Sequence, residues 1–221
     1  PRLKLWHKQD ANYQLPRQTI KLLLNSPNLI DTAEHAALLK LYVTVIQHRL
    51  SEITSQLLLA GTNIKVNPSS RGLNVEIDMF SDKQKPLMQT LLQQVKQSEV
   101  PTNRFLMVKD EVRREWVNYQ QEHPFVQAYK TLNTILFSNN WHPYRLLTEL
   151  DHITENHLKA YVEHFLQNVQ IECLVHGNVD EDNALDLAKF TFQALNKSFP
   201  KLTSKPMLNN RLIQLQSGDK Y

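Results

Sequence analysis

Cysteine, glycine and long apolar runs are scarce in this chain. Its 221 residues include one Cys and four Gly. A single Cys excludes an internal disulfide and any zinc cluster built from several thiolates. No apolar run approaches the ~20 residues that cross a membrane, and no secretory signal is visible. The motifs G-x-S-x-G, G-x-x-x-x-G-K and paired C-x-x-C are also missing from the sequence. Their absence disfavours the classes of protein that these motifs mark.

Charge of one sign is scarce as well. Lys and Arg number 25 against 22 Asp and Glu, which gives a net charge of +3 at pH 7. This small excess does not point to nucleic acid as a partner. The chain is 41% hydrophobic, which suits one globular domain over residues 1–221 with an ample core. It begins at Pro1 with no initiator Met, directly before the strand-like "RLKLWHK", so we expect a fragment or a processed chain.

Apolar periodicity predicts mixed strands and helices. Alternation predicts strands at 2–8 and 18–26, a hairpin from "NIKVN" to "GLNVEIDMF", and strands at "VQIECLVHGNV" and "RLIQLQ". Helices are predicted at 32–60, 82–97, 102–121, 125–138, 154–168 and 181–198. The order lacks regular βα alternation, so the predicted class is α+β, a mostly antiparallel sheet with helices packed on one face.

The stretch "LIDTAEHAALL", residues 29–39, is nearly a zinc-protease motif. It differs from H-x-x-E-H only in having Asp31 in place of the first His. Residues i and i+4 share one face of a helix, so Asp31 and His35 could hold one zinc ion while Glu34 polarises a bound water. His35 also lies on the apolar stripe of the predicted helix, where a half-buried, hydrogen-bonded His is the ordinary role.

The same letters fit a helix cap. Asp31 followed three positions later by Glu34 is the pattern of a capping box, in which Asp31 accepts backbone N–H bonds and Glu34 reaches back. This interpretation is favoured over metal binding.

Other candidate sites are weaker. His157 and His164 lie about 10 Å apart along a predicted helix, too far to share one ion. His7, His48, His123, His142, His152 and His176 show no spacing typical of metal ligands. Cys173 alternates with Ile171 and Val175, so it is expected to be a buried core thiol rather than a nucleophile.

Several segments together resemble a known family. "LWHKQDANYQLPRQTIKLLLNSP" (5–27) resembles the opening of the third domain of the insulinase family of zinc metallopeptidases, the insulysin- and pitrilysin-like enzymes. "LYVTVIQHRLSEITSQLLLAG" resembles the helix that follows there, and "IECLVHGNV" resembles a strand and turn near that domain's end. The resemblance covers nearly the whole chain in the right order.

The resemblance implies a metallohydrolase fold shared with mitochondrial processing peptidases. Long members carry four related α+β domains in two halves that close around a peptide chamber. Only the first domain carries H-x-x-E-H and a downstream Glu. Asp31, Glu34 and His35 would then be the degenerate copy of that motif, and Glu111 and Glu115 lie where the third ligand would be sought.

The resemblance therefore implies a non-catalytic domain, with no catalytic residue or metal ligand in this chain. Zinc would be a cofactor of the full-length enzyme, bound by another domain. The expected partners are other domains of the same polypeptide and peptide substrates, with residues 205–221 leading into the next domain. The compartment would be periplasmic for a pitrilysin-like bacterial protein and cytoplasmic otherwise. A free-standing inactive subunit beside a catalytic chain is an alternative, as is a single-domain metalloenzyme that uses Asp31 and His35.

Overall fold

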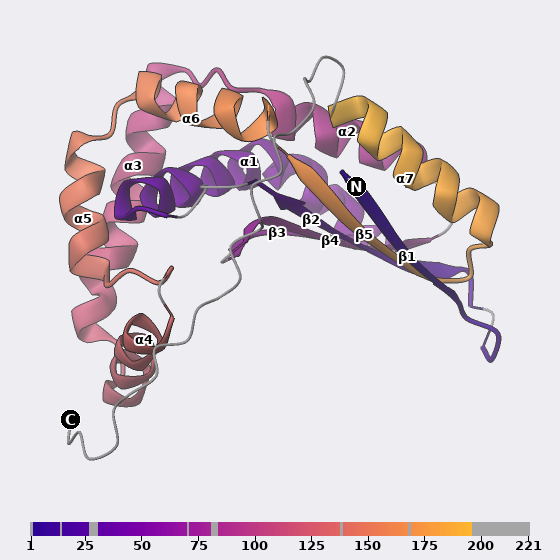
Figure 1. The fold of residues 1–221 in the computed structure, drawn as a ribbon, viewed down its shortest axis with the longest axis horizontal. Helices are drawn as coiled ribbons and strands as arrows, with labels where there is room; N and C mark the ends of the chain where they lie inside the picture. Colours follow the sequence, from indigo (N-terminus) through magenta and orange to yellow (C-terminus); the bar gives the residue numbers. More distant parts are fainter. Residues whose placement is uncertain are drawn as a thin grey trace.

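A five-stranded sheet forms the base of the fold (Figure 1). The computed structural model describes residues 2–13, 15–26, 31–69, 71–80, 84–137, 139–167 and 169–195. The strands are β1 (Leu3–Gln9), β2 (Arg17–Asn25), β3 (Asn63–Ser69), β4 (Gly72–Phe80) and β5 (Gln170–Gly177). They lie in the order β1-β5-β2-β4-β3. β1 runs parallel to β5, and the remaining neighbours are antiparallel, so the sheet is mostly antiparallel as expected.

The two faces of this sheet differ in chemistry. Successive side chains of a strand point to opposite faces, and the predicted alternation in β4 is confirmed. One face is packed by buried apolar side chains of β2 and β4, namely Ile20, Leu22, Leu24, Leu73, Val75, Ile77 and Met79. The other face carries polar pairs such as Lys21 and Glu76, whose Nζ and Oε1 atoms are 3.2 Å apart. The packed face therefore holds the core.

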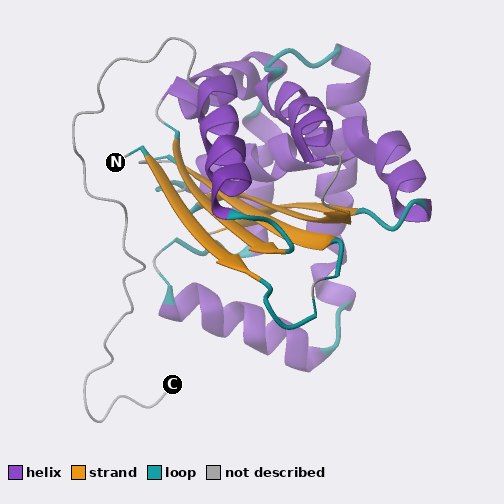
Figure 2. Ribbon diagram, turned by 90° about the vertical axis from the view of Figure 1, so that its right-hand side faces the viewer, coloured by secondary structure: helices purple, strands orange, loops and turns teal. Residues whose placement is uncertain are grey.

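Helices cover the packed face. The α helices of the described residues are α1 (Ala33–Leu59), α2 (Gln84–Lys96), α3 (Thr102–Val117), α4 (Pro124–Leu136), α5 (Pro143–His152), α6 (Glu155–Gln167) and α7 (Glu181–Leu195). A 3₁₀ turn at Asn118–Gln121 follows α3. In Figures 1 and 2, α1, α2 and α7 lie over the sheet, whereas α3, α5 and α6 surround α1 and α4 stands away from the sheet. The predicted α+β class is confirmed.

The long helix α1 is the centre of this layer. Its first half is buried against the sheet and the outer helices, including the predicted stripe residues Leu39, Val43, Ile46 and Leu50. The last two turns emerge from the core, and Leu59 is 93% exposed. The helix ends before Gly61, whose φ of 74° lies in the left-handed region that glycine adopts without strain.

Two sequence predictions differ from the structure or lie outside its description, and one observed helix was not predicted. The helix predicted at 102–121 is α helical only to Val117 and ends in the 3₁₀ turn. Helix α5 was not predicted, because Pro143 follows a short polar segment and the helix has only ten residues. "RLIQLQ" (211–216) lies outside the described residues. Among the described helices, none has the length and apolarity needed to cross a membrane.

Candidate functional site

The start of α1 carries the near-zinc motif, and the cap prediction is wrong there. The N-cap is Thr32, whose Oγ1 accepts the backbone N–H of His35 at 3.1 Å. Because the helix begins at Ala33, Asp31 lies one residue too early to cap it. The third helical position is then occupied by His35 rather than Glu34, so the reciprocal bond of a capping box is not available.

Asp31 instead pairs with His35, as the i, i+4 spacing predicted. Asp31 Oδ1 lies 2.5 Å from His35 Nδ1. Two ligands of one tetrahedral zinc ion stand farther apart, because each bond to the ion is about 2.0–2.2 Å long. The His35 ring is half-buried, and its centroid lies 5.8 Å from that of Tyr161 in α6. The predicted role of His35 as a hydrogen-bonded, half-buried residue is confirmed.

The acidic residues of α3 do not converge on this pair. Glu111 Oε2 accepts from His48 Nε2 at 2.7 Å, and Glu115 forms an ion pair with Lys40 at 2.7 Å. At a rise of 1.5 Å per residue, Lys40 and His48 stand about 7.5 Å and 20 Å beyond His35 along α1. Glu111 and Glu115, the two candidates for a third zinc ligand, are thus each paired with a basic side chain of α1.

No group of three metal-ligating side chains occurs within the part of the chain that the structure describes. The residues at the start of α1 therefore do not fit a zinc ion, since the available pair is closed by its own hydrogen bond. Cys173 is fully buried on β5, as predicted, and burial raises the pKa of its thiol to about 12. Such a thiol is protonated at neutral pH and lacks nucleophilic character.

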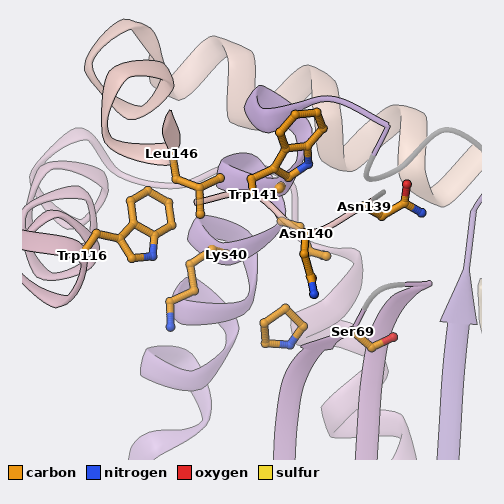
Figure 3. Close-up of a pocket in the computed structure, with 10 residues that line it drawn as sticks. Lys40, Ser69, Trp116, Asn139, Asn140, Trp141 and Leu146 are labelled. Atoms are coloured by element: carbon orange, nitrogen blue, oxygen red, sulfur yellow. The ribbon is translucent and has the colours of Figure 1, made fainter. Parts of the chain in front are cut away.

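The other flank of α1 borders a groove that sequence reasoning missed (Figure 3). A pocket of about 270 Å³ lies between α1, the end of β3, α3 and the segment before α5. Its lining residues are Ala36, Leu39, Lys40, Pro68, Ser69, Trp116, Asn139, Asn140, Trp141 and Leu146. A second pocket of about 450 Å³ shares Lys40, Trp116 and Trp141 and extends to α4. Because these segments are distant in sequence, no local pattern could have revealed the groove.

The groove offers binding chemistry rather than reactive chemistry. Trp141 and Trp116, the latter only 8% exposed, line the pocket with aromatic rings, and Asn140 adds an amide. Lys40 is held by Glu115, so its charge is already balanced. Aromatic side chains beside a few polar groups are typical of pockets that bind a ligand.

Family models match nearly all of the chain. One, described as the middle or third domain of peptidase M16, matches residues 1–149. Another, described as the peptidase M16 inactive domain, matches residues 152–214. The two matches meet within α5, yet β5 from the second region lies between β1 and β2 from the first. The two regions therefore build one sheet.

Individual relatives are much longer than this chain. An insulin-degrading enzyme of Drosophila melanogaster is 28% identical over 224 residues, which cover 100% of this chain and 23% of that protein. The Homo sapiens insulin-degrading enzyme is 26% identical over 96% of this chain and 20% of its own length. A crystal structure of pitrilysin superposes with a TM-score of 0.82 at 19% identity, covering 88% of this chain and 21% of that one. The chain thus spans about a fifth to a quarter of these proteins.

Proposed function

Because the chain belongs to the peptidase M16 family, we propose that it is a non-catalytic domain of a larger zinc metalloendopeptidase that degrades peptides. The resemblance inferred from residues 5–27 and from "IECLVHGNV" is confirmed by both family matches. The observation that carries the proposal is the match of residues 152–214 to a domain described as inactive. The relatives named as insulin-degrading enzymes indicate peptides as the substrate class.

In this proposal the domain forms part of the wall of a substrate chamber and of the surface between domains. Zinc and the residues that hydrolyse the peptide lie on another domain. The hydrogen bond between Asp31 and His35 supports this division of labour, as do the ion pairs that hold Glu111 and Glu115. The aromatic groove beside α1 supplies a surface on which a peptide or a neighbouring segment can rest.

One observation favours a second candidate, a single-domain metalloenzyme. Asp31 and His35 do meet at the start of α1, four positions apart as two zinc ligands would be. The metal content of purified residues 1–221 separates the candidates. The proposal predicts far less than one zinc per chain after gel filtration in zinc-containing buffer. A stoichiometric zinc ion that is lost in His35→Ala would support the metalloenzyme instead.

A fluorogenic-peptide assay tests the division of labour. Residues 1–221 should not cleave peptides with or without added zinc, because hydrolysis needs a metal with a full ligand set and a positioned base. The full-length protein should cleave them in a chelator-sensitive manner, and deletion of this domain should abolish turnover. Chelator-sensitive cleavage by residues 1–221 that disappears in His35→Ala would overturn the proposal. A native gene product no longer than this chain would favour a separate inactive subunit.

A further inference from the structure

Helix α4 exposes its apolar side. Phe125, Tyr129, Leu132 and Ile135 recur at spacings of four and three, so they share one helical face. Their exposed fractions are 74%, 64%, 48% and 43%. The structure describes every residue of α4, and none of them is buried. An amphipathic helix on a soluble domain normally turns such a face toward the core.

Polar contacts hold α4 in this orientation. The Gln127 side chain donates to the carbonyl oxygens of Gln120 and Glu122 at 3.1 and 2.8 Å. Thr131 Oγ1 lies 3.1 Å from the Tyr119 hydroxyl, and Lys130 Nζ lies 2.7 Å from the Glu122 carboxylate. These contacts come from the side of α4 opposite to its apolar face. The helix therefore meets its own domain through polar atoms and presents apolar atoms outward.

The charge of α4 limits the kind of partner. Lys130 is its one charged residue, and Glu122 already balances that charge. The exposed face thus has no unpaired charge with which to attract an anionic or cationic ligand. A mainly apolar surface fits it best, because burial of apolar area drives association without a matching charge.

The size of the face argues for a tethered partner. With roughly 150–200 Å² for a large apolar side chain, the exposed fractions of these two aromatic and two aliphatic residues amount to about 400 Å². A stable interface between separate proteins takes about 800 Å² from each partner. A domain on the same polypeptide needs less, because the tether gives it an effective concentration of order millimolar. The matched insulin-degrading enzymes carry more than three quarters of their length outside the matching region.

We propose that the outward face of α4, formed by Phe125, Tyr129, Leu132 and Ile135, docks against an apolar surface of a neighbouring domain of the same polypeptide. This inference rests on the proposed function, since it needs a longer chain. Beyond the proposed function, it identifies α4 as the segment of this domain that contacts the neighbouring domain.

Hydroxyl-radical footprinting of the full-length protein tests the docking directly. Phe125 and Tyr129 are reactive aromatic probes, and Tyr42, which is 1% exposed, sets the level of a buried ring. Native modification of Phe125 and Tyr129 should fall about tenfold below that of the unfolded protein, near the level of Tyr42. Rates within about twofold of the unfolded protein would overturn the inference.

A matched pair of variants separates docking from general effects. Leu132→Arg in α4 should restore the reactivity of Phe125 and Tyr129 in the full-length protein. Leu106→Arg in α3 places the same change at a leucine that is 58% exposed, and it should leave both probes protected. Protection that Leu132→Arg does not alter would count against the docking.

The remaining outcomes identify other occupants, and each overturns the inference. Protection that grows with protein concentration would mean a second copy of the chain. Protection that requires added peptide would mean a substrate. Peptidase activity measured on the same sample keeps the two proposals distinguishable. Chelator-sensitive cleavage with an exposed α4 would contradict only the proposed docking. A protected α4 without cleavage would contradict only the proposed function.

Discussion

Helices α1 and α4 both carry an apolar stripe, yet they use these stripes in opposite ways. In α1 the stripe from Leu39 to Leu50 is buried at the centre of the domain. In α4 the corresponding stripe points away from the domain, and polar side chains make the contacts inward. The comparison teaches that apolar periodicity predicts a helix with a partner but does not say whether that partner lies in the same domain.

The largest expected effect comes from truncating each stripe in residues 1–221. Ile46 is fully buried, so Ile46→Ala should lower the free energy of unfolding by about 2–5 kcal/mol through lost burial and a residual cavity. Leu132→Ala should change it by less than about 0.5 kcal/mol, because that side chain is half exposed and borders no packed core. Urea denaturation measures both. A loss of several kcal/mol for Leu132→Ala would mean that α4 packs inward, and the contrast would fail.

A second, smaller effect distinguishes how each helix is anchored. The Tyr42 hydroxyl of α1 donates to the carbonyl of Val95, one of the last carbonyls of α2, which have no partner within that helix. Burial raises the pKa of Tyr42 well above its ordinary value, so this donor stays protonated across the working pH range. Tyr42→Phe should therefore cost about 1–3 kcal/mol, the cost of leaving a buried acceptor unsatisfied.

The equivalent anchor of α4 is weaker. The Tyr119 hydroxyl donates to the carbonyl of Gln127 at 3.1 Å, but that oxygen also accepts from Thr131 Oγ1 at 2.8 Å. Tyr119→Phe leaves no orphaned acceptor, so it should cost about 0.5–1 kcal/mol. Amide hydrogen exchange should show faster opening of α4 and little change in α1. Equal losses for the two Phe variants in urea would show that both helices are held alike.

Local patterns were sufficient to predict most elements of the fold. The stripe of α1 and the alternation in β4 are long and regular, and both describe the buried faces correctly. Helix α5 escaped prediction because its ten residues give little more than two turns of periodicity. Strand order is not a local property, so the insertion of β5 between β1 and β2 could not be derived from alternation.

The candidate site was predicted less completely for the same reason. The spacing of four residues anticipated that Asp31 and His35 come together, although Asp31 lies before the first residue of α1. The pairing of Glu115 with Lys40 joins residues 75 positions apart, and it depends on how α3 packs against α1. The cap was misplaced because two adjacent polar residues both fit the N-cap pattern, and only the observed first residue of the helix distinguishes them.

A last comparison concerns how the two helices begin. Thr32 Oγ1 caps α1, whereas α4 begins with Pro124 after His123, which makes no side-chain cap bond. Thr32→Ala should therefore cost about 1 kcal/mol, because a backbone N–H of the first turn loses its acceptor. Thr32→Ser should restore most of that loss. His123→Ala should be close to neutral, since the His123 side chain makes no cap hydrogen bond that the substitution could remove.

Asp31→Ala completes this comparison and tests the corrected cap. Asp31 and His35 form a partly exposed i, i+4 pair, and pairs of this kind contribute about 0.3–0.5 kcal/mol. Urea denaturation of the four variants should thus rank Thr32→Ala as the most damaging and Asp31→Ala well below it. If Asp31→Ala were as costly as Thr32→Ala, the carboxylate would share the capping role that the sequence first suggested. The first turn of α1 would then be held by two acceptors, and its contrast with the uncapped start of α4 would be larger still.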